Sequence, residues 1–244
     1  MLAGKMRVGK CALRLGLRIV SLRATVDSAQ RTEGTPAYKG RVKYTPEKAR
    51  AYQVRAERKE RAELRLVERA FQIIPRGRVL DAPCGGGRVT LLLAGLGYEM
   101  TAGDLSDSMI EITGEKIAEA GLKIPVEKQD VERLTYPDRH FDAIISFRLF
   151  HHFPDAGIRE RVVRELCRVA REHVALSYFS PYSFTSMKRK MRAARGGRKS
   201  QKHSTPLSEV ELYFHNCGFE LVRDFARLNL VHTLHLAVFR RKQS

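Results

Sequence analysis

Between residues 78 and 179, short apolar runs alternate with longer segments whose apolar residues recur every three or four positions. Continuous short apolar runs are typical of strands buried on both faces, whereas the longer period is typical of helices. The predicted strands span 78–83, 99–105, 123–131, 141–147 and 173–179, and the predicted helices span 88–96, 107–120 and 158–171. Strands that alternate with helices in this way predict βαβ units and a parallel sheet.

A long helix is expected ahead of the first strand. Thr45 suits its N-cap, Pro46 suits its first helical position, and an apolar face continues to about residue 71. Residues 1–44 carry no comparable pattern and are predicted to be a basic tail and linker with little order. The folded part is therefore expected to span 45–244, with 45–73 as a helix that covers the site.

The alternation stops after residue 180 and resumes near the C-terminus. Ser208 can cap a helix that ends at about Cys217, and strand-like runs follow at 219–227 and 232–241. Two late strands joined by a short loop suit an antiparallel hairpin at a sheet edge. We predict a single-domain α/β fold: a Rossmann-like, doubly wound, mostly parallel sheet with a C-terminal antiparallel hairpin and an insertion at 181–204.

The net charge of +18 would by itself suggest a nucleic-acid-binding protein. However, residues 1–26 hold six cations and residues 181–203 hold eight, with no acid in either stretch, so these two segments supply fourteen of the excess charges. The basic character belongs to a tail and an insertion, and the remainder has the charge balance of an ordinary enzyme.

The cysteines and the N-terminal segment indicate where in the cell the protein resides. None of the four cysteines forms a CxxC pair and no Cys/His spacing suits zinc, so we expect no metal and a reducing, cytoplasmic environment. Residues 1–30 are rich in Arg and Leu and poor in acids. They are compatible with an organelle transit peptide, with an amphipathic segment on an anionic membrane surface, or with a disordered or misassigned start.

A glycine-rich turn follows the first predicted strand, in the sequence Val79-Leu80-Asp81-Ala82-Pro83-Cys84-Gly85-Gly86-Gly87. Glycine lets the backbone adopt positive φ and approach a ligand closely. The helix after the turn offers free amide donors at its N-terminus. Such a turn indicates a nucleotide-like cofactor, although similar turns also bind NAD or ATP or are purely structural.

Two acidic residues strengthen this interpretation. Asp104 ends the second strand and can accept hydrogen bonds from both hydroxyls of a ribose. Asp130 ends the third strand, where a carboxylate could accept from an adenine amino group. Because the carboxyl ends of parallel strands meet at one edge of a sheet, the turn and both acids are expected to lie together.

The segments DAPCGGG, GDLSDSMI and QDVERLTYPDRHFDAIISFRLFHHF together resemble the class I S-adenosylmethionine-dependent methyltransferases, especially the ubiquinone/menaquinone-type and other small-molecule enzymes. The resemblance covers roughly 45–180 and, more loosely, the chain to 241. It implies an enzyme with S-adenosylmethionine as cofactor. The residues implied in cofactor binding are Asp81, Pro83, Cys84, Gly85, Gly87, Asp104, Leu105, Met109, Asp130, Val131 and Phe147.

By this resemblance, the glycine turn and Asp81 would line the methionine end of the cofactor and Asp104 would hold its ribose. Leu105 and Met109 would pack near the adenine. Pro83 departs from the family pattern, which has glycine there, and proline lacks an amide donor. The spacing D-x-P-x-G-x-G also differs from the G-x-G-x-x-G that is typical of NAD-binding turns.

Residues after the fourth strand are candidates for the acceptor side. His151 or His152 could act as a general base, or both could be structural. Arg148 could pair with an anionic acceptor, or form an ion pair with Asp142 or Asp155. Tyr178 and Tyr182 follow the fifth strand and could also face the acceptor.

The basic insertion favours an anionic acceptor. We expect a small-molecule, glycan or lipid-linked substrate, with peripheral contact to an anionic membrane surface. An RNA methyltransferase that uses both basic segments is the second hypothesis, and a non-enzymatic regulator that binds S-adenosylmethionine is the third. The tetrapeptide that is typical of exocyclic-amine nucleic-acid methyltransferases is replaced by SFRL, and Cys84 is better explained as a small loop residue than as a nucleophile.

Overall fold

The computed structural model describes residues 57–196, 202–226 and 233–243. All of them belong to one unit that spans Ala37–Ser244. The predicted helix start at Thr45 and the basic tail lie outside the described residues, and their boundaries stay predictions.

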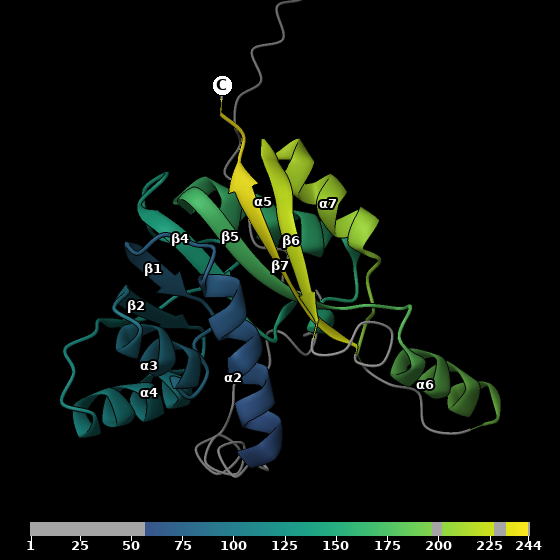
Figure 1. Ribbon diagram of the computed structural model, residues 1–244, viewed down its shortest axis with the longest axis horizontal. Coiled ribbons are helices and arrows are strands. Elements are labelled where there is room, and N and C mark those ends of the chain that lie inside the picture. The colour runs from purple at the N-terminus through teal and green to yellow at the C-terminus, as the bar shows by residue number, and fades with distance from the viewer. Residues whose placement is uncertain (1–56, 197–201, 227–232, 244) are drawn as a thin grey trace, which may run out of the picture. The chain divides into compact units, whose positions relative to one another are not determined.

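The described residues contain a seven-stranded mixed sheet, which confirms the predicted fold class (Figure 1). The order of the strands across it is β3-β2-β1-β4-β5-β7-β6. The first five are parallel, and β7 runs antiparallel to both β5 and β6. The strands are β1 (Arg78–Asp81), β2 (Glu99–Asp104), β3 (Val126–Lys128), β4 (Phe141–Ser146), β5 (Ala170–Phe179), β6 (Phe219–Ala226) and β7 (Leu234–Arg241).

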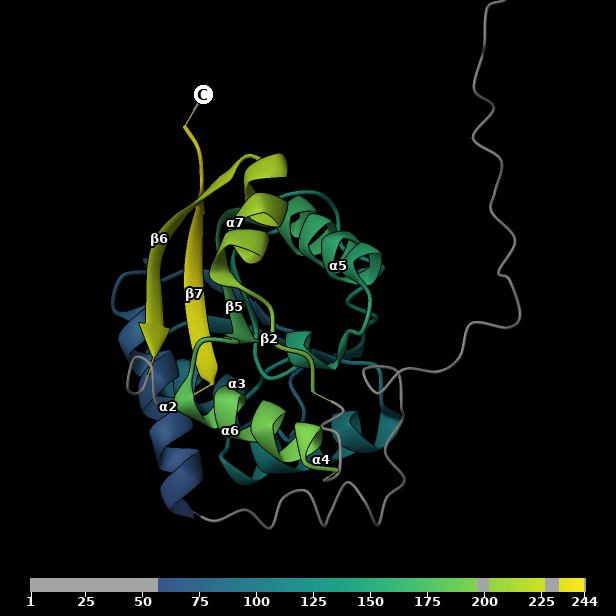
Figure 2. The ribbon, with the colours of Figure 1, turned by 90° about the vertical axis from the view of Figure 1, so that its right-hand side faces the viewer.

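Helices cover both faces of this sheet because its central strands are apolar on both sides. On β1, Val79 packs with α2 (Glu57–Phe71) and α3 (Arg88–Gly95), whereas Leu80 packs with α5 (Ala156–Val169) and α7 (Leu207–Asn216). Figure 2 shows α5 and α7 side by side on one face. Helix α4 (Asp107–Glu119) lies along β2 and β3.

Two predicted elements differ from the structure, and one helix was not predicted. Strand β3 covers only Val126–Lys128, because it lies at the sheet edge and pairs with β2 alone. Pro206, rather than Ser208, is the N-cap of α7, a position where the missing amide hydrogen of proline costs nothing. The insertion also contains a helix, α6 (Phe184–Ala194), that we did not predict.

Candidate active site

The glycine turn joins β1 to α3 at the carboxyl edge of the sheet. Gly85 and Gly87 have φ values of 54° and 76°, in the left-handed region that favours glycine. A Cβ on Gly87 would lie 3.0 Å from Thr113 Cγ2, so this position needs glycine for the close approach of α4. A Cβ on Gly85 would meet no atom within 4 Å, so the turn is open at this point.

Asp81, the last residue of β1, lies beneath the turn and is 1% exposed. Its Oδ2 accepts a hydrogen bond from Thr90 Oγ1 at 2.7 Å, whereas its Oδ1 is buried with no hydrogen-bond partner among the described residues. Burial raises the pKa of Asp81 to about 7, and the nearby charge of Asp104 adds to the effect. A buried carboxylate oxygen that lacks a donor is a suitable acceptor for a ligand amine.

Asp104 ends β2 and is tied to the same turn. Its Oδ2 accepts from the Gly85 backbone N–H at 3.0 Å and its Oδ1 accepts from the Ser106 N–H at 2.9 Å. Burial raises the pKa of the Asp104 carboxyl, although these backbone donors oppose the shift. The structure therefore brings Asp81, Gly85 and Asp104 to one edge of the sheet.

Cys84 lies in the same turn and stays a thiol. Burial, followed by the charges of Asp81 and Asp104, raises its pKa well above the ordinary value. Its Sγ lies 3.7 Å from Thr113 Oγ1. The side chain is therefore a small buried part of the turn and is poorly suited to act as a nucleophile.

Other residues predicted for the cofactor lie nearby but differ in exposure. Met109 is buried on α4 beside Ile112, and Leu105 is partly exposed between β2 and α4. The backbone N–H of Gln129 donates to the Asp104 carbonyl at 2.9 Å, which places Asp130 next to the end of β2. The remaining three are Pro83, which is partly exposed in the turn, Val131, which packs in the core beneath α5, and Phe147, which packs on the α2 face.

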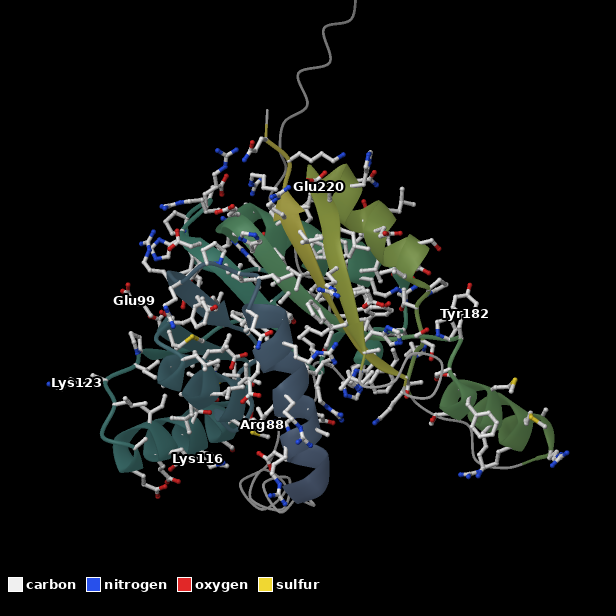
Figure 3. All side chains as sticks on the ribbon, viewed as in Figure 1. Arg88, Glu99, Lys116, Lys123, Tyr182 and Glu220 are labelled. Carbon is white, nitrogen blue, oxygen red and sulfur yellow. The ribbon has the colours of Figure 1, made fainter. Side chains whose placement is uncertain are left out.

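A buried ion-pair cluster joins α2 to this edge. Glu63 pairs with Arg88, the first residue of α3, at 2.9 Å and with Arg148 at 2.5 Å. Figure 3 shows Arg88 beside α2. We refer to Glu63, Arg88 and Arg148 as the Glu63 cluster. No sequence motif indicated Glu63; the available signal was an acid among the buried positions of α2.

The ion pairs considered for Arg148 with Asp142 or Asp155 are wrong. Asp142 pairs with Arg171 at 2.9 Å, and Asp155 accepts from the Ile158 N–H as the N-cap of α5. Arg148 follows β4 with a φ of 65°, a conformation that strains a residue other than glycine. Its backbone N–H donates to Ser177 Oγ on β5. Glu63 already offsets the Arg148 charge, which weakens the case for Arg148 as an anion receptor.

The two histidines differ in environment. They end the short 3₁₀ helix η2 (Phe150–His152). His151 is buried and stacks on the Phe179 ring with centroids 3.9 Å apart, while the His151 carbonyl accepts from the His203 N–H at 2.9 Å. His152 is only partly buried, and its ring lies 4.1 Å from that of His151.

The two tyrosines predicted near the acceptor do not lie together. Tyr178 points to the α5 and α7 face of the sheet, where its hydroxyl donates to Asp224 at 3.0 Å. Tyr182 is exposed just before α6 (Figure 3). Within the described ranges, no group of three or more His, Cys, Asp or Glu side chains is placed to hold a metal ion.

Comparison with known proteins confirms the fold and matches part of the chain to a family. The family described as "Methyltransferase domain" matches residues 79–173, which include the glycine turn and Asp104. A ubiquinone biosynthesis O-methyltransferase of Coxiella burnetii is 38% identical over 85 residues, which are 34% of this chain and 36% of that protein. A protein of Encephalitozoon cuniculi named as a methyltransferase is 30% identical over 144 residues, or 58% of this chain and 64% of that one.

Solved structures share this fold. Magnesium protoporphyrin IX methyltransferase from Synechocystis, with bound S-adenosylhomocysteine, has a TM-score of 0.63 at 19% identity and covers 75% of this chain and 83% of that one. A S-adenosylmethionine-dependent methyltransferase from Clostridium acetobutylicum has a TM-score of 0.61 at 14% identity, with 75% and 92% covered. Residues 79–173 thus match a methyltransferase domain, and the fold is that of the class I S-adenosylmethionine-dependent methyltransferases. The match spans little more than a third of the length of the ubiquinone enzyme.

The site fits S-adenosylmethionine, the cofactor of the methyltransferases that this chain resembles. The buried Asp81 Oδ1 can accept from the amino group of the methionine portion, and the open side of Gly85 leaves room for it. Each carboxylate oxygen of Asp104 accepts one hydrogen bond from a backbone N–H. A second lone pair on each oxygen can therefore accept from a ribose hydroxyl. Asp81, Gly85 and Asp104 are thus the residues that would hold S-adenosylmethionine.

Proposed function

We propose that this methyltransferase transfers a methyl group from S-adenosylmethionine to a small-molecule acceptor that is lipid-linked and anionic. The observation that carries the transfer is the buried edge formed by Asp81, Gly85 and Asp104. The names of two similar proteins, for ubiquinone and magnesium protoporphyrin, indicate small-molecule acceptors. The basic and apolar segment after β5 favours an anionic, lipid-linked one.

S-adenosylmethionine supplies a methyl group that is already activated on a sulfonium sulfur. The protein therefore acts mainly by positioning and by excluding water. Asp81 and Asp104 would orient the cofactor, and α2, fixed by the Glu63 cluster, lies beside the start of α3. Where the acceptor carries a hydroxyl, His152 is better exposed than His151 to take its proton.

Transfer of labelled methyl groups into cell extracts tests this function. The methyltransferase, S-adenosylmethionine labelled at the methyl carbon, and an extract would be incubated and then separated into solvent-extractable, aqueous small-molecule and RNA fractions. We expect label in the solvent-extractable fraction, and less of it with Asp104→Ala at the same cofactor concentration. Label confined to RNA would favour an RNA methyltransferase, and cofactor binding without transfer to any fraction would favour a regulator; either result would refute the proposal.

A further inference from the structure

Exposed apolar side chains gather in one short stretch of this chain. Of the nine large hydrophobic residues that are exposed in the described ranges, four lie between residues 182 and 191. They are Tyr182, Phe184, Met187 and Met191, which are 71%, 61%, 52% and 49% exposed. The other five lie apart from one another in the sequence, two of them in α7 and β6 and three between elements. A concentration of this kind on a soluble fold marks a surface that binds something.

The spacing of these residues creates a single apolar stripe. Phe184, Met187 and Met191 occupy positions i, i+3 and i+7 of α6, so they share one side of the helix. The base of the helix is anchored elsewhere: Ser183 and Ser186 are buried, and Ser186 Oγ donates to the Ser180 carbonyl at 2.8 Å. The stripe is therefore not what holds α6 to the fold.

Cations flank the stripe. Lys188 and Arg192 each follow a methionine of the stripe by one position, and the segment 181–208 contains no Asp or Glu. An exposed helix with an apolar stripe, flanking cations and no acid has the composition of helices that lie in the interface of an anionic bilayer. A protein partner of ordinary composition would not require the complete absence of acids.

We propose that α6 docks this protein on an anionic membrane surface, with Phe184, Met187 and Met191 inserted among the lipids. Lys188 and Arg192 then lie at the level of the phosphate groups. The stripe binds a phospholipid bilayer: its flanking cations contact the anionic headgroups and its apolar side chains contact the acyl chains.

Helix α6 begins at the same edge of the sheet as the proposed cofactor site. Ser180 directly follows the carboxyl end of β5, and the parallel strands β1 and β2 end at the same edge with Asp81 and Asp104. A docked α6 would hold that edge close to the bilayer, where a lipid-linked acceptor resides. This consequence rests on the proposed function, whereas the docking itself does not.

Tryptophan fluorescence tests the docking directly, because the chain contains no tryptophan. Met191→Trp places a single probe in the stripe, and Leu212→Trp places a matched probe at an exposed apolar position of α7. Phosphatidylcholine vesicles with and without phosphatidylglycerol would be added to the full chain. We expect a blue shift and quenching by brominated lipid for Met191→Trp with the anionic vesicles alone, and no change for Leu212→Trp.

Co-sedimentation with the same vesicles separates α6 from the basic N-terminal segment. Phe184→Ser/Met187→Ser/Met191→Ser should weaken binding to the anionic vesicles by about tenfold or more, since each of these apolar side chains would otherwise be buried among the lipids. Leu212→Ser/Val222→Ser should leave it unchanged. The proposal would be overturned if the triple variant and the Leu212→Ser/Val222→Ser variant bound the vesicles equally well. It would also be overturned if Met191→Trp showed no blue shift, or if RNA and not vesicles produced the shift. Calorimetric titration with S-adenosylmethionine tests the proposed function separately.

Discussion

Asp81 and Asp104 are buried carboxylates at adjoining strand ends; the charge of Asp104 raises the pKa of Asp81, and both charges raise the pKa of Cys84. The Asp81 Oδ1 has no donor among the described residues, although the side chain is almost fully enclosed. A buried polar atom without a partner destabilises the fold. A cofactor amine that bonds to Oδ1 would remove this penalty, so the residue is better explained by ligand binding than by stability.

Asp81→Asn should stabilise the protein at pH 8 and weaken cofactor binding. The pKa of Asp81 is about 7 in the fold against 3.8 for the free group, so between these values the folded state binds more protons than the unfolded state. Stability therefore falls as the pH rises from about 4 to 7, by at most about 4 kcal/mol since one pKa unit is about 1.4 kcal/mol. Asparagine avoids this cost and keeps an oxygen for Thr90.

Thermal unfolding of both proteins between pH 5 and pH 8 measures this difference. We expect the melting temperature of Asp81→Asn to exceed that of the wild type at pH 8, and the gap to narrow toward pH 5. A gap that is constant with pH would contradict the account of Asp81.

The two histidines can be separated by their pH–rate profiles once an acceptor is identified. If the acceptor is a hydroxyl, His152→Asn should lower kcat by about 10²–10⁴-fold and remove the acid limb of the pH–rate profile, which is the fall in kcat at low pH. His151→Asn should mainly reduce stability, because it loses the stack on Phe179. The reverse assignment would follow if His151→Asn alone removed the acid limb.

Among the elements, α2 is held to the cofactor edge by charge as well as by apolar packing. Leu66, Val67 and Phe71 pack on the sheet, and Glu63 pairs with two arginines from α3 and from the end of β4. Both arginines are largely buried. Breaking a buried ion pair by removing one partner is strongly destabilising because the remaining charge stays buried.

Glu63→Gln should therefore lower the free energy of unfolding by about 3 kcal/mol, measured by urea titration. Glu68→Gln on the same helix should change it by less than about 0.5 kcal/mol. If the two variants were equally stable, the Glu63 cluster would not hold α2 in place.

The sequence could predict the parts of the site that belong to local patterns, but not the contacts between distant residues. The glycine turn, Asp81 and Asp104 belong to local strand–turn–helix patterns, so their meeting at one edge followed from the order of the elements. The pairing of Glu63 with Arg148 joins residues 85 positions apart and leaves no local pattern.

Two other features could not be predicted from the sequence: the direction of Tyr178 and the helix α6. The direction of Tyr178 could not be predicted because β5 is buried on both faces, so its residues do not alternate between apolar and polar. Helix α6 was not predicted because cations are dense in this insertion, whereas the apolar pattern of the helix consists of only Phe184, Met187 and Met191.

At the scale of the whole molecule, two surfaces meet at one edge of the sheet. The first is the buried carboxylate site after β1 and β2, and the second is the apolar stripe of α6, which begins just after β5. The charge of +18 is concentrated outside the cofactor site, in the insertion and in the tail. Cofactor chemistry and membrane attachment would therefore be separable by substitution.

Calorimetric titration of the full chain with S-adenosylmethionine tests the central claim, that the β1 and β2 edge binds this cofactor. We expect saturable binding by the wild type and at least about a tenfold loss of affinity for Asp104→Ala, since hydrogen bonds to a charged group contribute about 1.5–3 kcal/mol. Asp107→Ala removes an exposed acid three residues away, which pairs with Lys128, and should bind as the wild type does. Absence of binding, or equal affinities for all three proteins, would contradict the account.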